Sequence, residues 1–250
     1  MARGALAENL TALAALAQKG VVSGAVARER TLPVLPALAG LLPMGAVQRG
    51  SIVACQGVAG VSLALSLAAG ASQEGAWVGV AGLPGLGVAA AVELGVVPER
   101  LVLVVEPAQG PALHFGDERW AEVLAAMIDG FDVVVLGAAA QQVRPATARR
   151  LVARLHARGA VALTVGSAVG DAADQGSFAA DLTLAAEGVS WYGLGDGHGV
   201  ARGRRAEVQV GGRRMHRPRR AHLWLPGGEG RVEPVDHPSG DRVVPLRPAG

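Results

Sequence analysis

The stretch that decides the fold is "SIVACQGVAGVSLAL", residues 51–65. It begins with a short apolar run typical of a buried strand, and it ends in an apolar run long enough for a helix. A strand, a glycine-containing turn and a helix in this order are the layout of a phosphate-binding loop, whose pattern is Gly-x-x-x-x-Gly-Lys-Ser/Thr. Gly60 and Ser62 stand at the second glycine and the hydroxyl, but Cys55 replaces the first glycine and Val61 replaces the lysine.

Loss of the lysine removes the charge of the site while leaving part of its backbone pattern. Phosphate loops bind anions because backbone N–H groups and a helix N-terminus point at the phosphate, and glycines permit that approach. Without a lysine, no fixed cation faces the outer phosphates, where phosphoryl transfer most requires one. We therefore expect a vestigial phosphate loop that keeps its backbone cradle and binds no cofactor, formed by Cys55, Gly57, Gly60, Val61 and Ser62.

The other parts of a nucleotide site are missing as well. A magnesium-orienting acid would follow the predicted strand "FDVVVL", but Gly137 stands there. The first acid after the second strand is Glu93, which we place well inside the next helix, and Asp132 precedes its strand and so faces the opposite end of the sheet. Ser167 is the one polar residue after "VALTVG". These losses predict no catalytic residues and exclude a nucleoside triphosphatase.

Composition narrows the class of protein further. The 250 residues are 50% hydrophobic but 3% aromatic, which predicts one large core of Ala, Val and Leu. The single cysteine, Cys55, excludes an internal disulfide and is expected to be a buried core residue in a reducing cytoplasm. His198, His216 and His222 have no acid or cysteine cluster at ligand spacing, so we expect no metal site.

No signal peptide or membrane span is expected. The N-terminus lacks a basic start followed by an apolar core. Residues 51–73 carry no charge, but the run is rich in Ala and Gly and inserts poorly into a bilayer, so a buried strand followed by a buried helix explains it better. The expected location is the cytoplasm, where the protein could associate with the nucleoid.

Strands alternate with helices through the middle of the chain. Short, nearly continuous apolar runs predict strands at residues 51–55, 76–81, 101–105, 131–136 and 160–165. Helical patterns lie between some of them, at residues 61–72, 117–129 and 145–158. This alternation predicts an α/β fold with a mostly parallel, twisted sheet flanked by helices. Further strands without helices, at 181–186, 204–210 and 221–225, predict an antiparallel extension.

The ends of the chain differ from this core. An amphipathic helix is expected at residues 5–19, with Leu6, Leu10 and Leu13 on its apolar stripe, and we assign residues 1–37 to this helix and a linker. Residues 38–225 form the predicted core. From residue 226 on, five prolines and five glycines in 25 residues predict an extended or flexible tail. The helix could equally dock onto a partner or pack on its own domain.

The frame as a whole resembles a known family. "LLPMGAVQRGSIVACQGVAGVSLALSLAAGASQEGAWVGVAG" is similar to the opening of the RecA-type core, and "ELGVVPERLVLVV", "IDGFDVVVLGAA", "RRLVARLHARGAVALTVGS" and "ADLTLAAEGVSW" resemble its later elements in the same order. "GVARGRRAEVQVGGRR" and "RPRRAHLWLPG" resemble the last strands of the ImuA branch, particularly the form called ImuA-prime. The resemblance covers residues 38–230, and residues 166–176 are the one candidate for a DNA-gripping loop.

The resemblance implies a non-catalytic RecA-like accessory protein of DNA damage-induced translesion synthesis. Its implied partners are an ImuB-type Y-family polymerase-like protein, RecA and an error-prone replicative-type polymerase. Two alternatives remain. One is a SulA-like inhibitor of cell division, although such chains are shorter and lack the basic C-terminal strands. The other is a phosphate-loop ATPase with a displaced cation, for which Arg49 or Arg100 would have to enter the loop.

A basic segment near the C-terminus is the remaining candidate contact surface. Residues 202–220 hold eight arginines and one acid, so without their net charge of +7 the chain changes from +2 to −5. Such a local excess suits DNA phosphates or an acidic protein surface, or it is a solvated edge in an arginine-rich protein. Besides the three N-terminal leucines, the candidate partner or DNA contacts are Arg204, Arg205, Arg213, Arg214, Arg217, Arg219 and Arg220.

Overall fold

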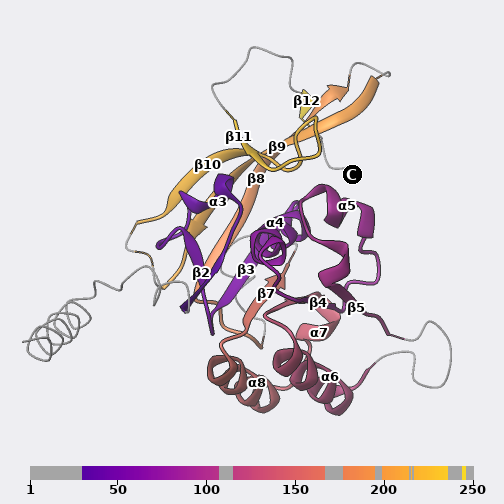
Figure 1. Cartoon of the computed structure of the whole chain (residues 1–250), viewed down its shortest axis with the longest axis vertical. Helices are drawn as coiled ribbons and strands as arrows, with labels where there is room; N and C mark the ends of the chain where they lie inside the picture. Colours follow the sequence, from indigo (N-terminus) through magenta and orange to yellow (C-terminus); the bar gives the residue numbers. More distant parts are fainter. Residues whose placement is uncertain are drawn as a thin grey trace, which may run out of the picture.

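The computed structural model describes residues 30–106, 115–166, 177–194, 199–213, 215, 217–235 and 244–245. Within these residues, one large mixed sheet forms the centre of the molecule (Figure 1). Its strand order is β11-β10-β9-β8-β3-β7-β6-β4-β5, with β12 pairing with β8. The strands are β3 (Ile52–Gly57), β4 (Val78–Ala81), β5 (Leu101–Val104), β6 (Val133–Leu136), β7 (Val161–Val165), β8 (Leu182–Leu194), β9 (Gly199–Gly211), β10 (Arg219–Trp224), β11 (Glu233–Pro234) and β12 (Val244–Pro245).

The half of the sheet from β8 through β3 to β5 is parallel. The chain places β4 and β5 directly after β3, yet in space β7 and β6 separate β3 from β4. A small antiparallel pair, β1 (Thr31–Pro33) and β2 (Ala46–Gln48), lies beside the sheet. The helices are α3 (Pro36–Ala39), α4 (Gly60–Gln73), α5 (Val88–Glu93), the 3-10 turn η1 (Pro98–Arg100), α6 (Asp117–Gly130), α7 (Ala138–Gln141) and α8 (Pro145–Arg158).

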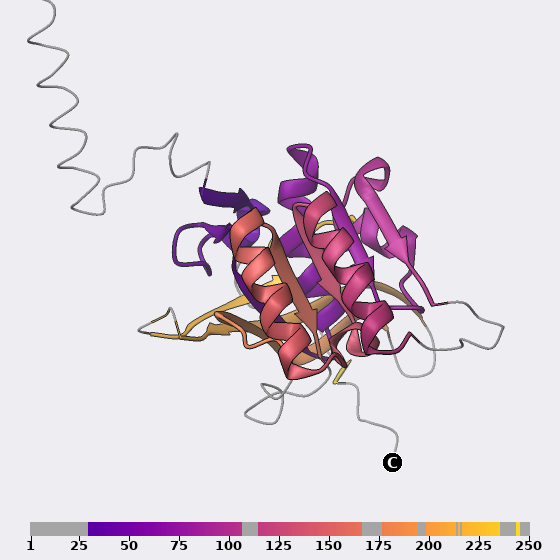
Figure 2. The ribbon, with the colours of Figure 1, turned by 90° about the horizontal axis from the view of Figure 1, so that it is seen from below.

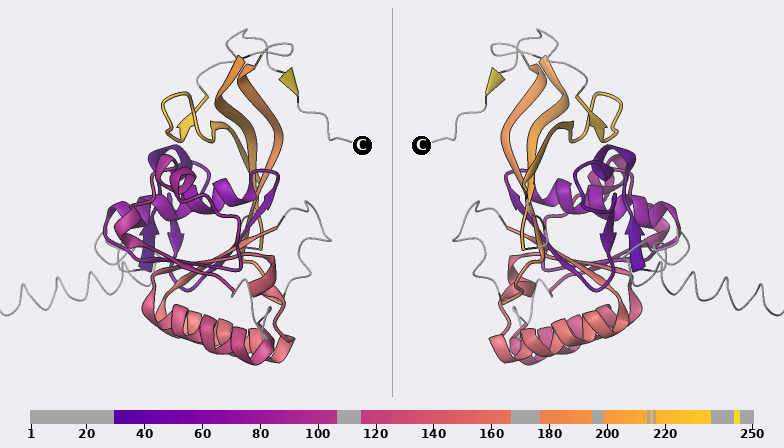
Figure 3. Two further views of the ribbon diagram at one scale, coloured as in Figure 1. Left: turned by 90° about the vertical axis from the view of Figure 1, so that its right-hand side faces the viewer. Right: turned by 90° about the vertical axis from the view of Figure 1, so that its left-hand side faces the viewer.

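Helices cover the two faces of the parallel half. Helices α6 and α8 lie side by side against one face, and α4 lies against the other (Figure 2, Figure 3). The alternation along β6 shows both contacts: Val133 and Val135 belong to the core beneath α4, whereas Val134 and Leu136 belong to the core beneath α6 and α8. Strands buried on both faces must be apolar at every position, which is why their sequences are continuous apolar runs.

The predicted elements are confirmed, with shifts at their ends. Helix α8 has the predicted bounds, whereas the strand predicted at 51–55 ends two residues later, at Gly57. The antiparallel extension is also confirmed, because β9 pairs antiparallel with both β8 and β10. Strands β8 and β9 are much longer than predicted and run past the helical layers (Figure 3). Their distal parts contain glycines and polar residues because many positions there are exposed, as at residues 199–202 of β9, which are exposed on both faces.

Strands are found on both sides of the predicted core, residues 38–225. Strand β1, with Leu32 buried, belongs to the core although it lies in the predicted linker 1–37. At the other end, residues 226–235 fold back on the sheet, where β11 pairs with β10 and the Pro226 carbonyl accepts a hydrogen bond from the Arg204 N–H at 2.8 Å. The flexible tail predicted from residue 226 therefore does not describe residues 226–235. The helix predicted at 5–19, with Leu6, Leu10 and Leu13, lies outside the described residues.

Candidate functional site

The junction between β3 and α4 forms a tight turn rather than an open phosphate loop. Strand β3 stays in the sheet through Gly57, where Cys55, Gln56 and Gly57 pair with β8. Gly57 turns the chain with a φ of +85°, a conformation that favours glycine. Only Val58 and Ala59 then separate the strand from the helix. Of the residues predicted to form the vestigial loop, Cys55 and Gly57 are paired in the sheet, whereas Gly60, Val61 and Ser62 lie in the first turn of α4.

Close packing around the junction requires glycine at two positions. A Cβ added to Gly60 would lie 2.8 Å from the carbonyl oxygen of Cys55, so this glycine lets the helix start pack on the strand. A Cβ added to Gly137, where the magnesium-orienting acid is missing, would lie 2.0 Å from the carbonyl oxygen of Gly82. Any side chain at position 137, an acid included, would therefore require the backbone at Gly82 to move.

An arginine from the antiparallel extension reaches this junction. Arg204 on β9 donates a hydrogen bond through Nη2 to the hydroxyl of Ser62 in the first turn of α4. Its Nε donates to the Leu225 carbonyl oxygen at 2.8 Å, and its guanidinium carbon lies 5.5 Å from the centre of the Trp191 ring. Burial lowers the pKa of Arg204, because desolvation disfavours the charged guanidinium. The hydroxyl that would hold magnesium in a phosphate loop is therefore bound by a protein cation.

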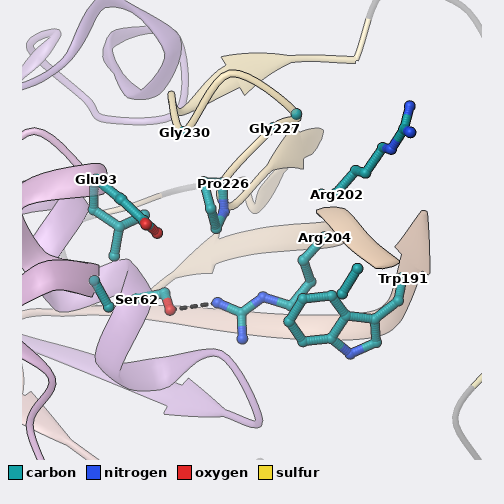
Figure 4. A pocket seen from close by; sticks show the side chains of 13 residues that line it. Ser62, Glu93, Trp191, Arg202, Arg204, Pro226, Gly227 and Gly230 are labelled. Carbon is teal, nitrogen blue, oxygen red and sulfur yellow. Dashed lines mark hydrogen bonds between the residues drawn. The ribbon is translucent and has the colours of Figure 1, made fainter. Parts of the chain in front are cut away.

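A cavity of about 370 Å³ opens beside this contact. Figure 4 shows Ser62, Arg204 and Trp191 on one side, with Glu93 from α5 and Pro226 across from them. Glu93, predicted to lie well inside a helix, is the last residue of α5 and lines the cavity. A second cavity of about 310 Å³ is apolar, and both cavities share Ser62, Ala90 and Leu94. The junction thus borders a two-part groove between α4, α5 and the antiparallel strands.

The two arginines considered as displaced cations lie near the amino ends of the parallel strands, at the end of the sheet opposite to the β3–α4 junction. Arg49 forms an ion pair with Asp132 at 3.1 Å, and Asp132 also accepts a hydrogen bond from the Trp77 N–H at 3.2 Å. Trp77 and Asp132 directly precede β4 and β6, so they mark the amino ends of these strands, and Arg100 lies over the Trp77 ring. The prediction that Asp132 faces the end away from the loop is confirmed, and neither Arg49 nor Arg100 reaches Ser62.

Cys55 is a core residue. Its side chain is fully buried, and burial raises the pKa of the thiol far above its usual value, so the thiol stays protonated. Across the described part of the chain, no group of three His, Cys, Asp or Glu side chains could hold a metal ion. His222 is exposed on β10, and His198 and His216 lie outside the described residues. None of the described helices is both long and apolar enough to cross a membrane.

The basic segment does not form a single surface. Arg204 faces α4, and Arg219 donates to the carbonyl oxygens of Gly40 at 3.0 Å and Leu42 at 2.8 Å, where α3 ends. Arg220 pairs with Glu207 at 3.5 Å on the other face of the sheet. The remaining described arginines are spread along the extension: Arg205 is half-buried on β9, and Arg213 and Arg217 are exposed near the turn that joins β9 to β10. Arg214 lies outside the described residues.

Two other sequence candidates also lie outside the described residues. Ser167 and almost all of the predicted DNA-gripping segment 166–176 fall in a stretch that the structure does not describe. Sequence reasoning placed Arg204 on the surface and gave Glu93 no role in a site. One signal could have found Arg204: it shares a face of β9 with the buried residues Ala206, Val208 and Val210, at the spacing of two that defines one side of a strand.

The fold is that of an α/β protein with a mixed sheet. Arg204, from the antiparallel extension of this sheet, contacts the strand–turn–helix element formed by β3 and α4. A family model described as the MT3502 N-terminal domain matches residues 40–170, more than half of the chain. The chain belongs to this family. The matched region contributes Ser62, Ala90 and Glu93 to the groove, whereas Trp191 and Arg204 come from the part that follows it. Among curated proteins, no match to the chain was found.

Proposed function

We propose that this protein is a non-catalytic, RecA-like accessory protein of DNA damage-induced translesion synthesis. In this role it would serve as an adaptor for an ImuB-type Y-family polymerase-like partner, with RecA and an error-prone replicative-type polymerase as further contacts. The proposal has two parts, a RecA-type core and the loss of nucleotide chemistry. Each part rests on its own observations.

The arrangement of the sheet supports the RecA-type core. Strand β3, which carries the loop, lies between β7 and β8 in the middle of the sheet, and β4 and β5 lie beyond β7 and β6. Strand β9 is the antiparallel member beyond β8. A mostly parallel sheet with antiparallel strands added by the C-terminal part of the chain is what the resemblance to RecA-type cores leads us to expect.

The junction supports the loss of nucleotide chemistry, and one observation carries the proposal: the Ser62 hydroxyl accepts its hydrogen bond from Arg204. In a working loop this hydroxyl holds magnesium, and a lysine stands beside it. Here the hydroxyl faces a guanidinium, Val61 replaces the lysine, and an acid at position 137 would require the backbone at Gly82 to move. A RecA-type frame with these changes is suited to binding partners rather than to hydrolysis.

The contact between Arg204 and Ser62 also supplies the main structural argument for the ATPase alternative. Arg204 supplies a cation next to Ser62, and Glu93 lines the same cavity as an acid. If these two residues replaced the lysine and the general base, the protein would bind magnesium–ATP and turn it over. A Ser62→Ala variant separates the two functions, because it removes a magnesium ligand from an ATPase but only one hydrogen bond from an adaptor.

The decisive experiment measures ultraviolet-induced mutation in a strain that lacks the gene. We expect the induced mutation frequency to fall to the uninduced level, and we expect both the wild-type gene and the Ser62→Ala gene to restore it. The polymerase-like partner should co-purify with the full chain from the complemented strains. Normal induced mutagenesis in the deletion strain would contradict the proposal.

Two other outcomes would favour the alternatives. Failure of Ser62→Ala to restore mutagenesis, together with magnesium-dependent ATP binding by the wild-type protein, would identify an ATPase. A block of cell division on overproduction, together with direct binding to the tubulin-like division protein, would identify a SulA-like inhibitor.

A further inference from the structure

The groove contains a cation, Arg204, that forms no ion pair within the described residues, although the carboxylate of Glu93 lines the same cavity. Arg204 is half-buried, and its described hydrogen-bond partners are the Ser62 hydroxyl and the Leu225 carbonyl oxygen, both uncharged. Buried charges in proteins are normally paired, because removing an ion from water is costly. A guanidinium has five N–H donors, so these two contacts leave three for a ligand.

The position of Arg204 makes an added anion more favourable still. Ser62 lies in the first turn of α4, a 14-residue helix whose N-terminus has no side-chain cap. A helix N-terminus carries a partial positive charge, so a cation placed there is unfavourable and an anion is stabilised. An anionic group in the adjoining cavity would therefore interact with the guanidinium and the helix N-terminus at once. Arg202, exposed on the same strand, also lines this cavity.

The second cavity indicates what is attached to the anion. It is lined by Val61, Leu65, Leu83, Pro84, Leu86 and Leu94, and it joins the cationic cavity along Ser62, Ala90 and Leu94. A large apolar side chain suits this lining, because burying it there removes apolar surface from water.

We propose that this groove binds an acidic peptide segment of a partner protein, with an Asp or Glu carboxylate facing Arg204 and a neighbouring large apolar side chain in the second cavity. The two cavities together accommodate a few side chains, the size of a short peptide anchor. A nucleotide fits the observations less well, because Val61 stands where a phosphate loop has its lysine and the second cavity is apolar. This inference rests on the groove alone and does not depend on a role in translesion synthesis.

A selection from random peptides tests the chemistry of the ligand directly. A phage-displayed library of such peptides is selected on the full-length wild-type protein. We expect the selected peptides to be enriched in Asp or Glu next to Leu, Ile, Met or Phe. Absence of any enriched peptide, or enriched peptides without an acidic residue, would overturn the proposal.

Matched variants on α5 test the place of binding. Ala90 is exposed and lines both cavities, whereas its neighbour Ala89 is exposed and lines neither. Fluorescence anisotropy with the selected peptide should give a Kd of about 1–100 μM for the wild-type protein. Ala90→Glu should weaken binding by about ten-fold or more through repulsion and occlusion, and Ala89→Glu should change it by less than about two-fold. Equal affinities for both variants would overturn the proposal.

Two further measurements identify the anion. Arg204→Gln should weaken the acidic peptide but not a version with Asn or Gln in place of its acids, and the α5 pair keeps the test valid if this variant does not fold. Replacing the acids of the peptide with Lys should abolish binding. Competition with magnesium–ATP should leave the peptide bound, and displacement by ATP would show that the groove is a nucleotide site instead.

Discussion

At the scale of single residues, the closed junction depends on positions that carry almost no side chain. Gly137 has a φ of −77°, which suits any residue, so its conformation does not require glycine. The requirement for glycine comes from lack of space, because a Cβ at position 137 would lie 2.0 Å from the carbonyl oxygen of Gly82. The missing acid at this position is therefore a consequence of packing, and restoring the acid would push the loop of residues 82–87 away from β6.

Gly137→Ala should lower the free energy of unfolding by about 1–3 kcal/mol, because the added methyl group must displace backbone. Gly130→Ala is the matched control, since nothing lies within 4 Å of the added Cβ at the end of α6. The control should be neutral or more stable by up to about 1 kcal/mol, because alanine favours helix over glycine. Urea unfolding measures both variants, and equal stability of the two would contradict the steric argument.

Arg204→Ala should also destabilise the protein. The change removes the hydrogen bonds to Ser62 and to the Leu225 carbonyl oxygen, together with the stacking on Trp191. We expect a loss of about 1–3 kcal/mol in the free energy of unfolding, measured by urea titration. Arg213→Ala, which removes an exposed arginine of the same segment, should change stability by less than about 0.5 kcal/mol. A loss of equal size in both variants would show that Arg204 contributes only its charge.

At the scale of the elements, carboxylates fix α6 and α8 to each other at both ends. Asp117 begins α6 and accepts hydrogen bonds from the Arg144 N–H at 2.6 Å and the Thr147 hydroxyl at 3.0 Å, both at the start of α8. Asp129, near the other end of α6, accepts a hydrogen bond from Arg154 Nε at 2.8 Å. These contacts set the register of two helices whose apolar faces alone would permit sliding.

Asp117 makes the stability of the helix pair depend on pH. The backbone hydrogen bond from Arg144 lowers the pKa of Asp117 below its usual value, with help from the Thr147 hydroxyl and the nearby arginines. A lowered pKa means that the stabilisation is present above the unfolded pKa of about 3.9 and is lost as pH falls through the folded pKa. Asp117→Asn should therefore be less stable than wild type at neutral pH, and the difference should shrink below about pH 4.

Urea unfolding at neutral and acid pH measures this effect. Glu118→Gln is the control, because Glu118 is an exposed neighbour in the same first turn without a described hydrogen bond. A difference between Asp117→Asn and wild type that stays constant from neutral to acid pH would exclude the carboxylate as its cause.

At the scale of the whole molecule, residues 225–235 pack on the antiparallel strands that border the β3–α4 junction. Leu225 is fully buried, residues 227 and 228 lie against Gly203, and β11 pairs with β10. The groove therefore has one wall from the family-matched region and one from the end of the chain. Folding of the two parts is expected to be coupled.

A chain shortened to end at Leu225 should be markedly less stable than one shortened to end at Val235. The shorter chain loses the β11 pairing and the hydrogen bond between the Arg204 N–H and the Pro226 carbonyl. Thermal unfolding should show a lower midpoint for the shorter chain, by about 2–4 °C for each kcal/mol lost. Equal midpoints would mean that residues 226–235 only rest on the surface.

Much of the fold could be predicted because its signals are local. The continuous apolar runs predicted β6 and β7, and Pro145 with Gly159 predicted the bounds of α8, since Gly159 adopts the left-handed conformation that ends helices. The prediction of a flexible tail from residue 226 failed for residues 226–235 because proline and glycine content reports weak secondary structure, not the absence of tertiary contacts.

The sequence alone determined the class of fold and the absence of a lysine at Val61, because periodicity and residue identity are properties of the chain itself. Only the tertiary structure decided that the loop is closed, that an acid at position 137 would require the backbone at Gly82 to move, and that Arg204 binds Ser62. The physical reason is separation along the chain. Arg204 and Ser62 are 142 residues apart, and strand pairing across the sheet brings them together.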